Sequence, residues 1–184
     1  MKIKQHGFTM IELIVVIVIL GILSAVALPR FTNIQRDARI AKLNAARGAV
    51  QAAAGLIHGT ALARGGITDT LTCPGGGGFA DNLTGATGTV CTENGIITMV
   101  NSYPAATIAG IVSASGLTSV MNPTVPQLAA DGYQTAGAGP IDIRVMGGLN
   151  PATCFFRYTA AAANAAPLVS ATSPATATGS TAGC

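Results

Sequence analysis

The sequence predicts an α+β protein, in which one long N-terminal α-helix carries a small antiparallel β-sheet on its second half. Three observations support this class. Residues 8–28 are almost all apolar, residues 40–61 repeat apolar side chains at helical spacing, and strand-like stretches follow only after residue 95. We therefore expect a helix over about residues 8–62 and a globular, β-rich head over residues 65–184.

The apolar run of residues 8–28 is long enough to cross a bilayer, because about 20 apolar residues span it as a helix. Lys2 and Lys4 precede the run without any acid, which predicts a cytoplasmic N-terminus. A cleaved secretory signal is the simpler alternative, but its apolar core has only about 7–15 residues. A plain signal anchor would leave Glu12 unexplained, since a charge at the centre of a bilayer costs about 2.5–3.5 kcal/mol.

The stretch "GFTMIEL" after a short basic leader resembles the processing site of type IV pilins and of type II secretion pseudopilins. The resemblance implies that residues 1–7 are a leader and that a prepilin peptidase cuts between Gly7 and Phe8. The same enzyme would methylate the new amino group of Phe8, giving N-methylphenylalanine. Glu12 would be the assembly residue, which pairs with the Phe8 amine of the next subunit.

Weaker likenesses point to the mannose-sensitive haemagglutinin type of pilin. They lie in "ALPRFTNIQRDARIAKLNAARGAVQ", in "SYPAAT" and in the cysteine that ends the chain. The cysteine pair Cys73 and Cys91 departs from the single bridge that this type implies.

Residues 29–64 are predicted to form an amphipathic neck helix. Pro29 cannot donate a backbone N–H, so a kink is expected there, and Gly21 weakens the turn before it. The apolar stripe of this helix consists of Ile40, Leu43, Ala46, Val50, Ala53, Ile57 and Ala61. The neck also carries a basic cluster, which consists of Arg30, Arg36, Arg39, Lys42 and Arg47. A solvated face beside anionic lipid headgroups is the expected role of this cluster, and contacts along a filament are the alternative.

The head is predicted to hold three or four strands, at residues 96–100, 141–146, 154–159 and 167–172, with a turn or short helix over 105–112. Its four cysteines form no CxxC, so a zinc site is poorly supported. An even count in an exported chain favours two disulfides. Three pairings exist, and proximity along the chain favours Cys73–Cys91 with Cys154–Cys184.

Other chemistries find little support in the sequence. The Gly-rich loop after Cys73 lacks the Lys-Ser/Thr of a phosphate site, and Asp81 with Asn82 offers too few oxygens for calcium. His58 is the one histidine after residue 28, and we interpret it as an ordinary packed or surface side chain. We expect no catalytic residues, no metal, no cofactor and no nucleic-acid partner, because no catalytic constellation is present and the basic side chains do not gather on the head.

The resemblance therefore implies a non-enzymatic filament subunit. It would be held in the bacterial inner membrane by a single pass before assembly and would be extracellular in a pilus afterwards. Copies of itself, the prepilin peptidase, an assembly ATPase and an inner-membrane platform are the implied partners. The implied role is the major subunit of a type IV pilus used for surface adhesion or biofilm, and a pseudopilin of a type II secretion system is the alternative.

Overall fold

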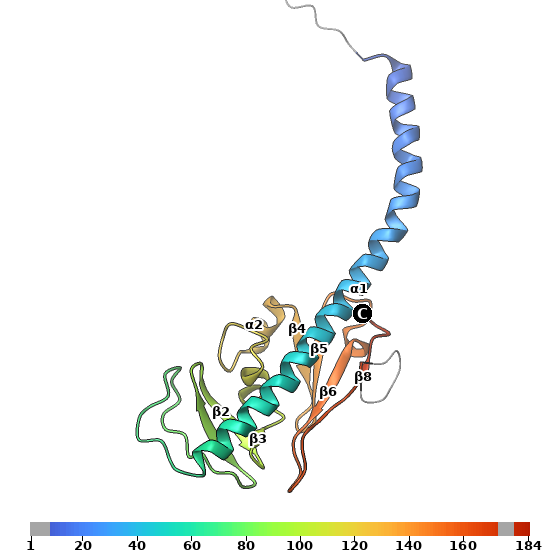
Figure 1. The fold of residues 1–184 in the computed structure, drawn as a ribbon. Helices are drawn as coiled ribbons and strands as arrows, with labels where there is room; N and C mark the ends of the chain where they lie inside the picture. Colours follow the sequence, from blue (N-terminus) through green and yellow to red (C-terminus); the bar gives the residue numbers. More distant parts are fainter. Residues whose placement is uncertain (1–7, 173–178) are drawn as a thin grey trace, which may run out of the picture. The chain divides into compact units, whose positions relative to one another are not determined.

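The structure is a computed structural model that describes residues 8–172 and 179–184 (Figure 1). The chain divides into two compact units, Met1–Ala38 and Arg39–Cys184. The first holds the start of the long helix, and the second holds the rest of that helix and the whole head.

The long helix α1 covers Met10–Arg64, a length of 55 residues. It ends where Gly65 and Gly66 adopt positive φ angles of 57° and 76°, a conformation that glycine adopts without steric cost. The predicted helix of about 8–62 is thus confirmed, with both ends two residues further along the chain. The helix continues through Pro29 without a break. The kink expected there stays a prediction.

The second unit packs around the predicted stripe of α1. Its buried side chains are Leu43, Ala46, Val50, Ala53, Ala54, Ile57 and Ala61. The first part of this stripe belongs to a core cluster with Ile143, Phe156 and Tyr158, and the last part to a smaller cluster with Val90, Ile97 and Met99. Figure 1 shows this half of α1 lying across the sheets of the head.

The head contains two antiparallel sheets instead of the single sheet that the sequence predicted. The first consists of β1 (Gly88–Thr92), β2 (Gly95–Val100) and β3 (Tyr103–Pro104), in that order. The second consists of β4 (Tyr133–Ala136), β5 (Ile141–Val145), β6 (Phe155–Thr159), β7 (Leu168–Val169) and β8 (Gly179–Ser180). In it the order is β4-β5-β6-β7, and β8 also pairs with β6.

The register of both sheets places apolar side chains toward α1. Val90 pairs with Ile97 in the first sheet, and Ile143 pairs with Phe156 in the second. Alternate residues of a strand share one face, so each pair brings two buried side chains to the face that α1 covers. Three short helices connect the strands: η1 (Ile108–Val112), α2 (Val125–Ala130) and η2 (Pro151–Thr153).

Three basic side chains of the neck bind the head instead of facing solvent as expected. Each donates a hydrogen bond to a backbone carbonyl: Arg39 to Cys184 at 3.0 Å, Lys42 to Asp131 at 2.6 Å and Arg47 to Ser170 at 2.7 Å. The Lys42 ammonium also lies 4.3 Å from the centre of the Tyr133 ring. We call Arg39, Lys42 and Arg47 the neck anchors. They tie α1 to segments that are more than 80 residues away in sequence.

Two disulfides close loops of the head, Cys73–Cys91 and Cys154–Cys184. The first joins the loop after α1 to β1, and the second joins the residue before β6 to the last residue. Cys73, Cys154 and Cys184 are buried, and Cys91 is partly exposed. Both bridges lie in the second unit.

Candidate functional site: the start of the long helix

The beginning of α1 is closed by a capping box that joins Thr9 and Glu12. Thr9 precedes the first helical residue, and its Oγ1 accepts the backbone N–H of Glu12 at 3.3 Å. In return, Oε2 of Glu12 accepts the backbone N–H of Thr9 at 3.1 Å and its hydroxyl at 2.9 Å. This is the reciprocal arrangement that Ser or Thr followed three residues later by Glu produces at helix starts.

The capping box occupies only one oxygen of the Glu12 carboxylate. Both bonds from Thr9 end on Oε2, and Oε1 has no hydrogen-bond partner among the described residues. A carboxylate has about four acceptor positions, so this one can hold its own helix start and still accept a further donor. The Glu12 side chain is thus held in one orientation, while its Oε1 can still accept a hydrogen bond from another group.

Sequence reasoning missed the role of Thr9. It explained the acid of the apolar run only through a second subunit, whereas the structure gives it a partner three residues away. The T-x-x-E spacing of "TMIE" was the signal that would have found it.

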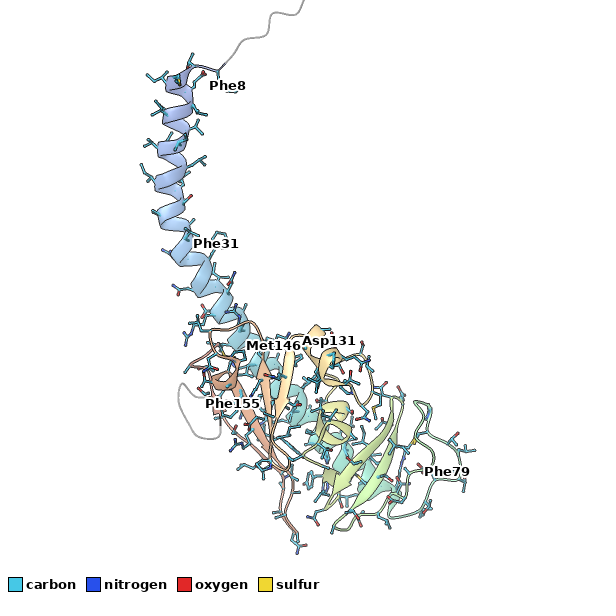
Figure 2. The ribbon with its side chains drawn as sticks, turned by 180° about the vertical axis from the view of Figure 1, so that it is seen from behind. Phe8, Phe31, Phe79, Asp131, Met146 and Phe155 are labelled. Carbon is cyan, nitrogen blue, oxygen red and sulfur yellow. A yellow bond between two sulfur atoms is a disulfide. The ribbon has the colours of Figure 1, made fainter. Side chains whose placement is uncertain are left out.

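The apolar side chains that follow are exposed throughout the first unit. Phe8 is 92% exposed, and Figure 2 shows its end of the helix and Phe31 with side chains projecting outward around the ribbon. Among the described residues, one helix is long and apolar enough to cross a membrane, and this is α1. No residue of its most apolar stretch is buried. Exposed apolar surface of this extent on a helix needs lipid or other helices as cover.

The remaining predicted site residues are placed as follows. Gly7 lies outside the described residues, as does the rest of the leader, while Phe8 is the first described residue. Gly21 and Pro29 lie inside α1, and a Cβ built on Gly21 would meet no atom within 4 Å. Cleavage, methylation and assembly at these residues stay predictions.

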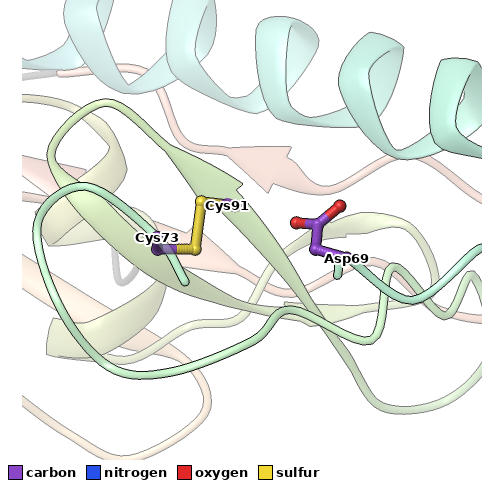
Figure 3. Close-up of side chains that lie close together, drawn as sticks. All are labelled: Asp69, Cys73 and Cys91. Carbon is purple, nitrogen blue, oxygen red and sulfur yellow. A yellow bond between two sulfur atoms is a disulfide. The ribbon is translucent and has the colours of Figure 1, made fainter. Parts of the chain in front are cut away.

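A group of Asp69, Cys73 and Cys91 in the head has the ligand types of a metal site but not the chemistry. The two sulfur atoms are bonded to each other, so neither is a thiolate that could bind a metal (Figure 3). The carboxylate of Asp69 is occupied by Arg64, which donates to Oδ2 at 3.1 Å, and by the Asn82 amide, which donates to Oδ1 at 2.8 Å. The group is a structural joint between the end of α1 and the loop that follows.

Asp81 also has a structural task in place of a ligand role. Its Oδ1 accepts the backbone N–H of Leu83 and both the N–H and the hydroxyl of Thr89, at 2.7–3.1 Å. Burial raises the pKa of this carboxyl, but the three hydrogen bonds outweigh burial and bring the pKa below its ordinary value. Asn82 is fully buried and donates to the carbonyl of Ile67.

The comparison with known proteins rests on the helix start. Residues 2–28 match the model of the prokaryotic N-terminal methylation motif. Over 50 residues the chain is 48% identical to the type IV narrow pilus major component PilA5 of Thermus thermophilus. The aligned stretch covers 27% of this chain and 43% of that protein. Over 53 residues it is 38% identical to the type IV major fimbrial protein FimA of Dichelobacter nodosus, covering 29% and 34%.

The chain is similar to type IV pilins over its N-terminal part. It spans less than half the length of the curated relatives it matches. No solved structure matches it significantly. The relatives are named as major components of pili and fimbriae.

Proposed function

We propose that this pilin is the major structural subunit of a type IV pilus that serves surface adhesion or biofilm formation. The observation that carries the proposal is the exposed apolar stretch of residues 8–28 with a single carboxylate, Glu12, one turn after the predicted cleavage site. Relatives named as major components of pili and fimbriae support it. The similarity of the neck to pilins of the mannose-sensitive haemagglutinin type also favours a surface fibre.

Before assembly, the pilin spans the inner membrane once with its N-terminus in the cytoplasm. Lys2 and Lys4 hold that end on the cytoplasmic side, and residues 8–28 fill the hydrocarbon core. Prepilin peptidase then cuts between Gly7 and Phe8 and methylates the Phe8 amine. An assembly ATPase and an inner-membrane platform lift the subunit into the filament, where neighbouring helices replace lipid around the apolar surface.

The assembly contact is an ion pair across subunits. Cleavage creates an ammonium on Phe8, and Oε1 of Glu12 on a neighbour is oriented to accept it because Thr9 holds Oε2. An ion pair in a medium of low dielectric constant is sensitive to distance, so only a neighbour at the matching height neutralises both charges. The pair would thereby fix the axial register of the filament.

Two substitutions separate this ion pair from the capping box. Glu12→Gln replaces the carboxylate by an amide whose oxygen can still cap the helix, since capping boxes accept Glu or Gln, and it removes the charge. Thr9→Ala removes the cap, at a cost of about 1 kcal/mol to the helix start, and keeps the carboxylate. We expect Glu12→Gln to be inserted and cleaved normally but absent from fibres, and Thr9→Ala to assemble.

Sheared surface fibres measured by immunoblot and electron microscopy provide the readout, with cleavage followed by the mass of the membrane-bound pilin. Normal fibres from Glu12→Gln would contradict the ion pair. Loss of fibres from Thr9→Ala alone would show that the cap, and not the charge, is the assembly requirement. Absence of any surface fibre built from the unmodified pilin would favour the pseudopilin alternative.

A further inference from the structure

One of the two disulfide bridges of the head can be reached from solvent at one of its sulfur atoms. Cys91 is partly exposed and lines two hollows, one of about 510 Å³ and one of about 310 Å³. Arg64 and Pro74 also line both, and we call the pair the Cys91 hollows. Its bonded partner Cys73 is only 4% exposed. A reagent that enters from solvent therefore meets the sulfur of Cys91 first.

The second bridge has different surroundings. Cys154 and Cys184 are 0% and 4% exposed, and both belong to the main core cluster of the head. Thiol–disulfide exchange requires that an attacking thiolate reach one of the two sulfur atoms. The two bridges of the same head should therefore differ in reactivity, and only the Cys73–Cys91 bridge is expected to react while the head is folded.

The two cysteines of the reactive bridge are held by different kinds of backbone. Cys91 lies in β1, where it pairs with Ile96 of β2. Cys73 stands before a run of four glycines, residues 75–78, and three of these have φ angles of 88°, 91° and 99°. Glycine moves among such conformations at little steric cost. If the bridge opens, Cys91 should keep its place in the sheet, and Cys73 should move away with the glycine run.

The base of this glycine-rich loop is closed by hydrogen bonds that do not involve the bridge. The backbone N–H of Asp69 donates to the carbonyl of Ala80 at 2.9 Å. The Asn82 amide donates to the carbonyl of Ile67 at 2.7 Å and to Oδ1 of Asp69 at 2.8 Å. Opening of the bridge should thus release residues 70–79 and leave the sheets of the head intact.

The charges around the bridge favour one kind of thiol. A carboxylate oxygen of Asp69 lies within 4.8 Å of both sulfur atoms (Figure 3), and Arg64 offsets this charge through an ion pair of 3.1 Å. Glu93 lines the larger of the Cys91 hollows, and its side chain makes no hydrogen bond or ion pair within the described residues. Two acids and one base leave a net negative charge beside Cys91, which attracts a cationic thiol and repels an anionic one.

We propose that the Cys73–Cys91 bridge exchanges with small aminothiols and that Cys91 receives the thiol. The thiolate of the aminothiol attacks Sγ of Cys91 and forms a new S–S bond with it. The bond between the two cysteine sulfurs breaks, and Sγ of Cys73 leaves with the electron pair and takes a proton from water. One disulfide replaces another, so the step needs no oxidant and the chain gains one molecule of aminothiol.

The test uses three thiols that share a two-carbon skeleton: cationic cysteamine, neutral 2-mercaptoethanol and anionic 2-mercaptoethanesulfonate. The full chain in a neutral detergent is treated with each thiol at low salt, and cysteine thiols that are released are trapped with iodoacetamide. Peptide mass spectrometry then locates both modifications. We expect the added thiol on Cys91, the trapping group on Cys73, and an intact bridge between Cys154 and Cys184.

The rates of exchange test the charge selection. They are compared per thiolate, because the three thiols ionise to different extents. We expect cysteamine to react about threefold to tenfold faster than 2-mercaptoethanesulfonate at low salt, and the two rates to converge at about 1 M salt. Glu93→Gln should lower this ratio by about twofold or more. Asp131→Asn is the matched control and should leave the ratio unchanged, because Asp131 is an exposed acid outside the Cys91 hollows.

Absence of any adduct on the folded chain, or earlier reaction of the Cys154–Cys184 bridge, would overturn the proposed exchange site. An adduct on Cys73 in place of Cys91 would overturn the assigned point of attack. Faster reaction of the anionic thiol, or an unchanged ratio in Glu93→Gln, would overturn the preference for aminothiols. The test does not depend on filament assembly, so its failure leaves the proposed assembly function untouched.

Discussion

At the scale of single residues, two carboxylates stabilise nearby backbone through hydrogen bonds, a role that is easily mistaken for ligand binding. Glu12 closes the start of α1 through Thr9, and Asp81 holds the turn before β1 through Leu83 and Thr89. In both cases the carboxylate accepts the hydrogen bonds of nearby backbone and hydroxyl groups. An acid in this chain should therefore be tested for a local partner before a distant one is assigned.

Asp81 makes the stability of the head depend on pH. Its pKa is lower in the folded state than in the unfolded chain, so its contribution is complete above the unfolded value of about 4 and is lost as the pH falls through the folded value. We expect the free energy of unfolding to decrease on acidification below about pH 4, and Asp81→Asn to reduce that decrease.

Denaturant unfolding between neutral pH and the acid range measures this effect. Glu93→Gln is the control, because the Glu93 side chain makes no hydrogen bond or ion pair within the described residues. An unchanged pH profile in Asp81→Asn would show that other groups cause the acid sensitivity.

At the scale of elements, the neck half of α1 is held to the head by its apolar stripe and by the neck anchors. The anchors donate charge-assisted bonds to carbonyls, which are stronger than neutral ones. This gives three of the basic side chains of the neck, Arg39, Lys42 and Arg47, a role in holding the helix to the head.

Arg47 offers a direct test of the anchors. Its bond to the Ser170 carbonyl is partly buried at 2.7 Å, so Arg47→Ala should lower the free energy of unfolding by about 1.5–3 kcal/mol. Arg36→Ala is the matched control, since Arg36 is exposed on the same helix and has no partner among the described residues. Equal unfolding midpoints for the two variants would show that the anchor contributes no net stability.

The sequence predicted the elements whose signal is local. The helix and the strands at β2, β5 and β6 follow from periodicity, and the segment at 167–172 is a strand over only two residues. β1 was missed because "GTVCT" continues a Gly-rich loop, and β4 because none of its four residues is fully buried. The division into two sheets depends on long-range pairing, which no local pattern specifies.

The residues of the candidate site were named from the sequence, and their roles in cleavage, methylation and assembly stay predictions. "GFTMIEL" is a contiguous motif, so the residues of the helix start could be named from the sequence. The role of Thr9 was not foreseen. It depends on the T-x-x-E spacing within the same motif, which also predicts a capping box.

At the scale of the whole molecule, the two units carry separate tasks. All buried apolar side chains of the described chain belong to the second unit, and both disulfides lie there. The first unit exposes its apolar surface and holds Phe8 and Glu12, the proposed assembly residues. Damage to the head should therefore leave membrane insertion and leader cleavage intact.

Removal of the second disulfide tests this separation. Cys154 and Cys184 are 30 residues apart, and opening a loop of this length should cost about 3–4 kcal/mol of head stability. We expect the double substitution Cys154→Ser with Cys184→Ser to lower the denaturation midpoint while insertion and cleavage remain normal. A cleavage defect in this variant would show that the peptidase requires a stable head.

Residues 81–82 cover part of the edge of β1, and this has a consequence for heads that lie close together. β1 lies at the edge of its sheet, and residues 81–82 occupy that edge: the Asn82 N–H donates to the Thr89 carbonyl, and Oδ1 of Asp81 accepts the Thr89 N–H. Open strand edges recruit strands from other molecules, which leads to aggregation. Many identical heads at high local density can thus lie side by side without this strand templating uncontrolled β-pairing between them.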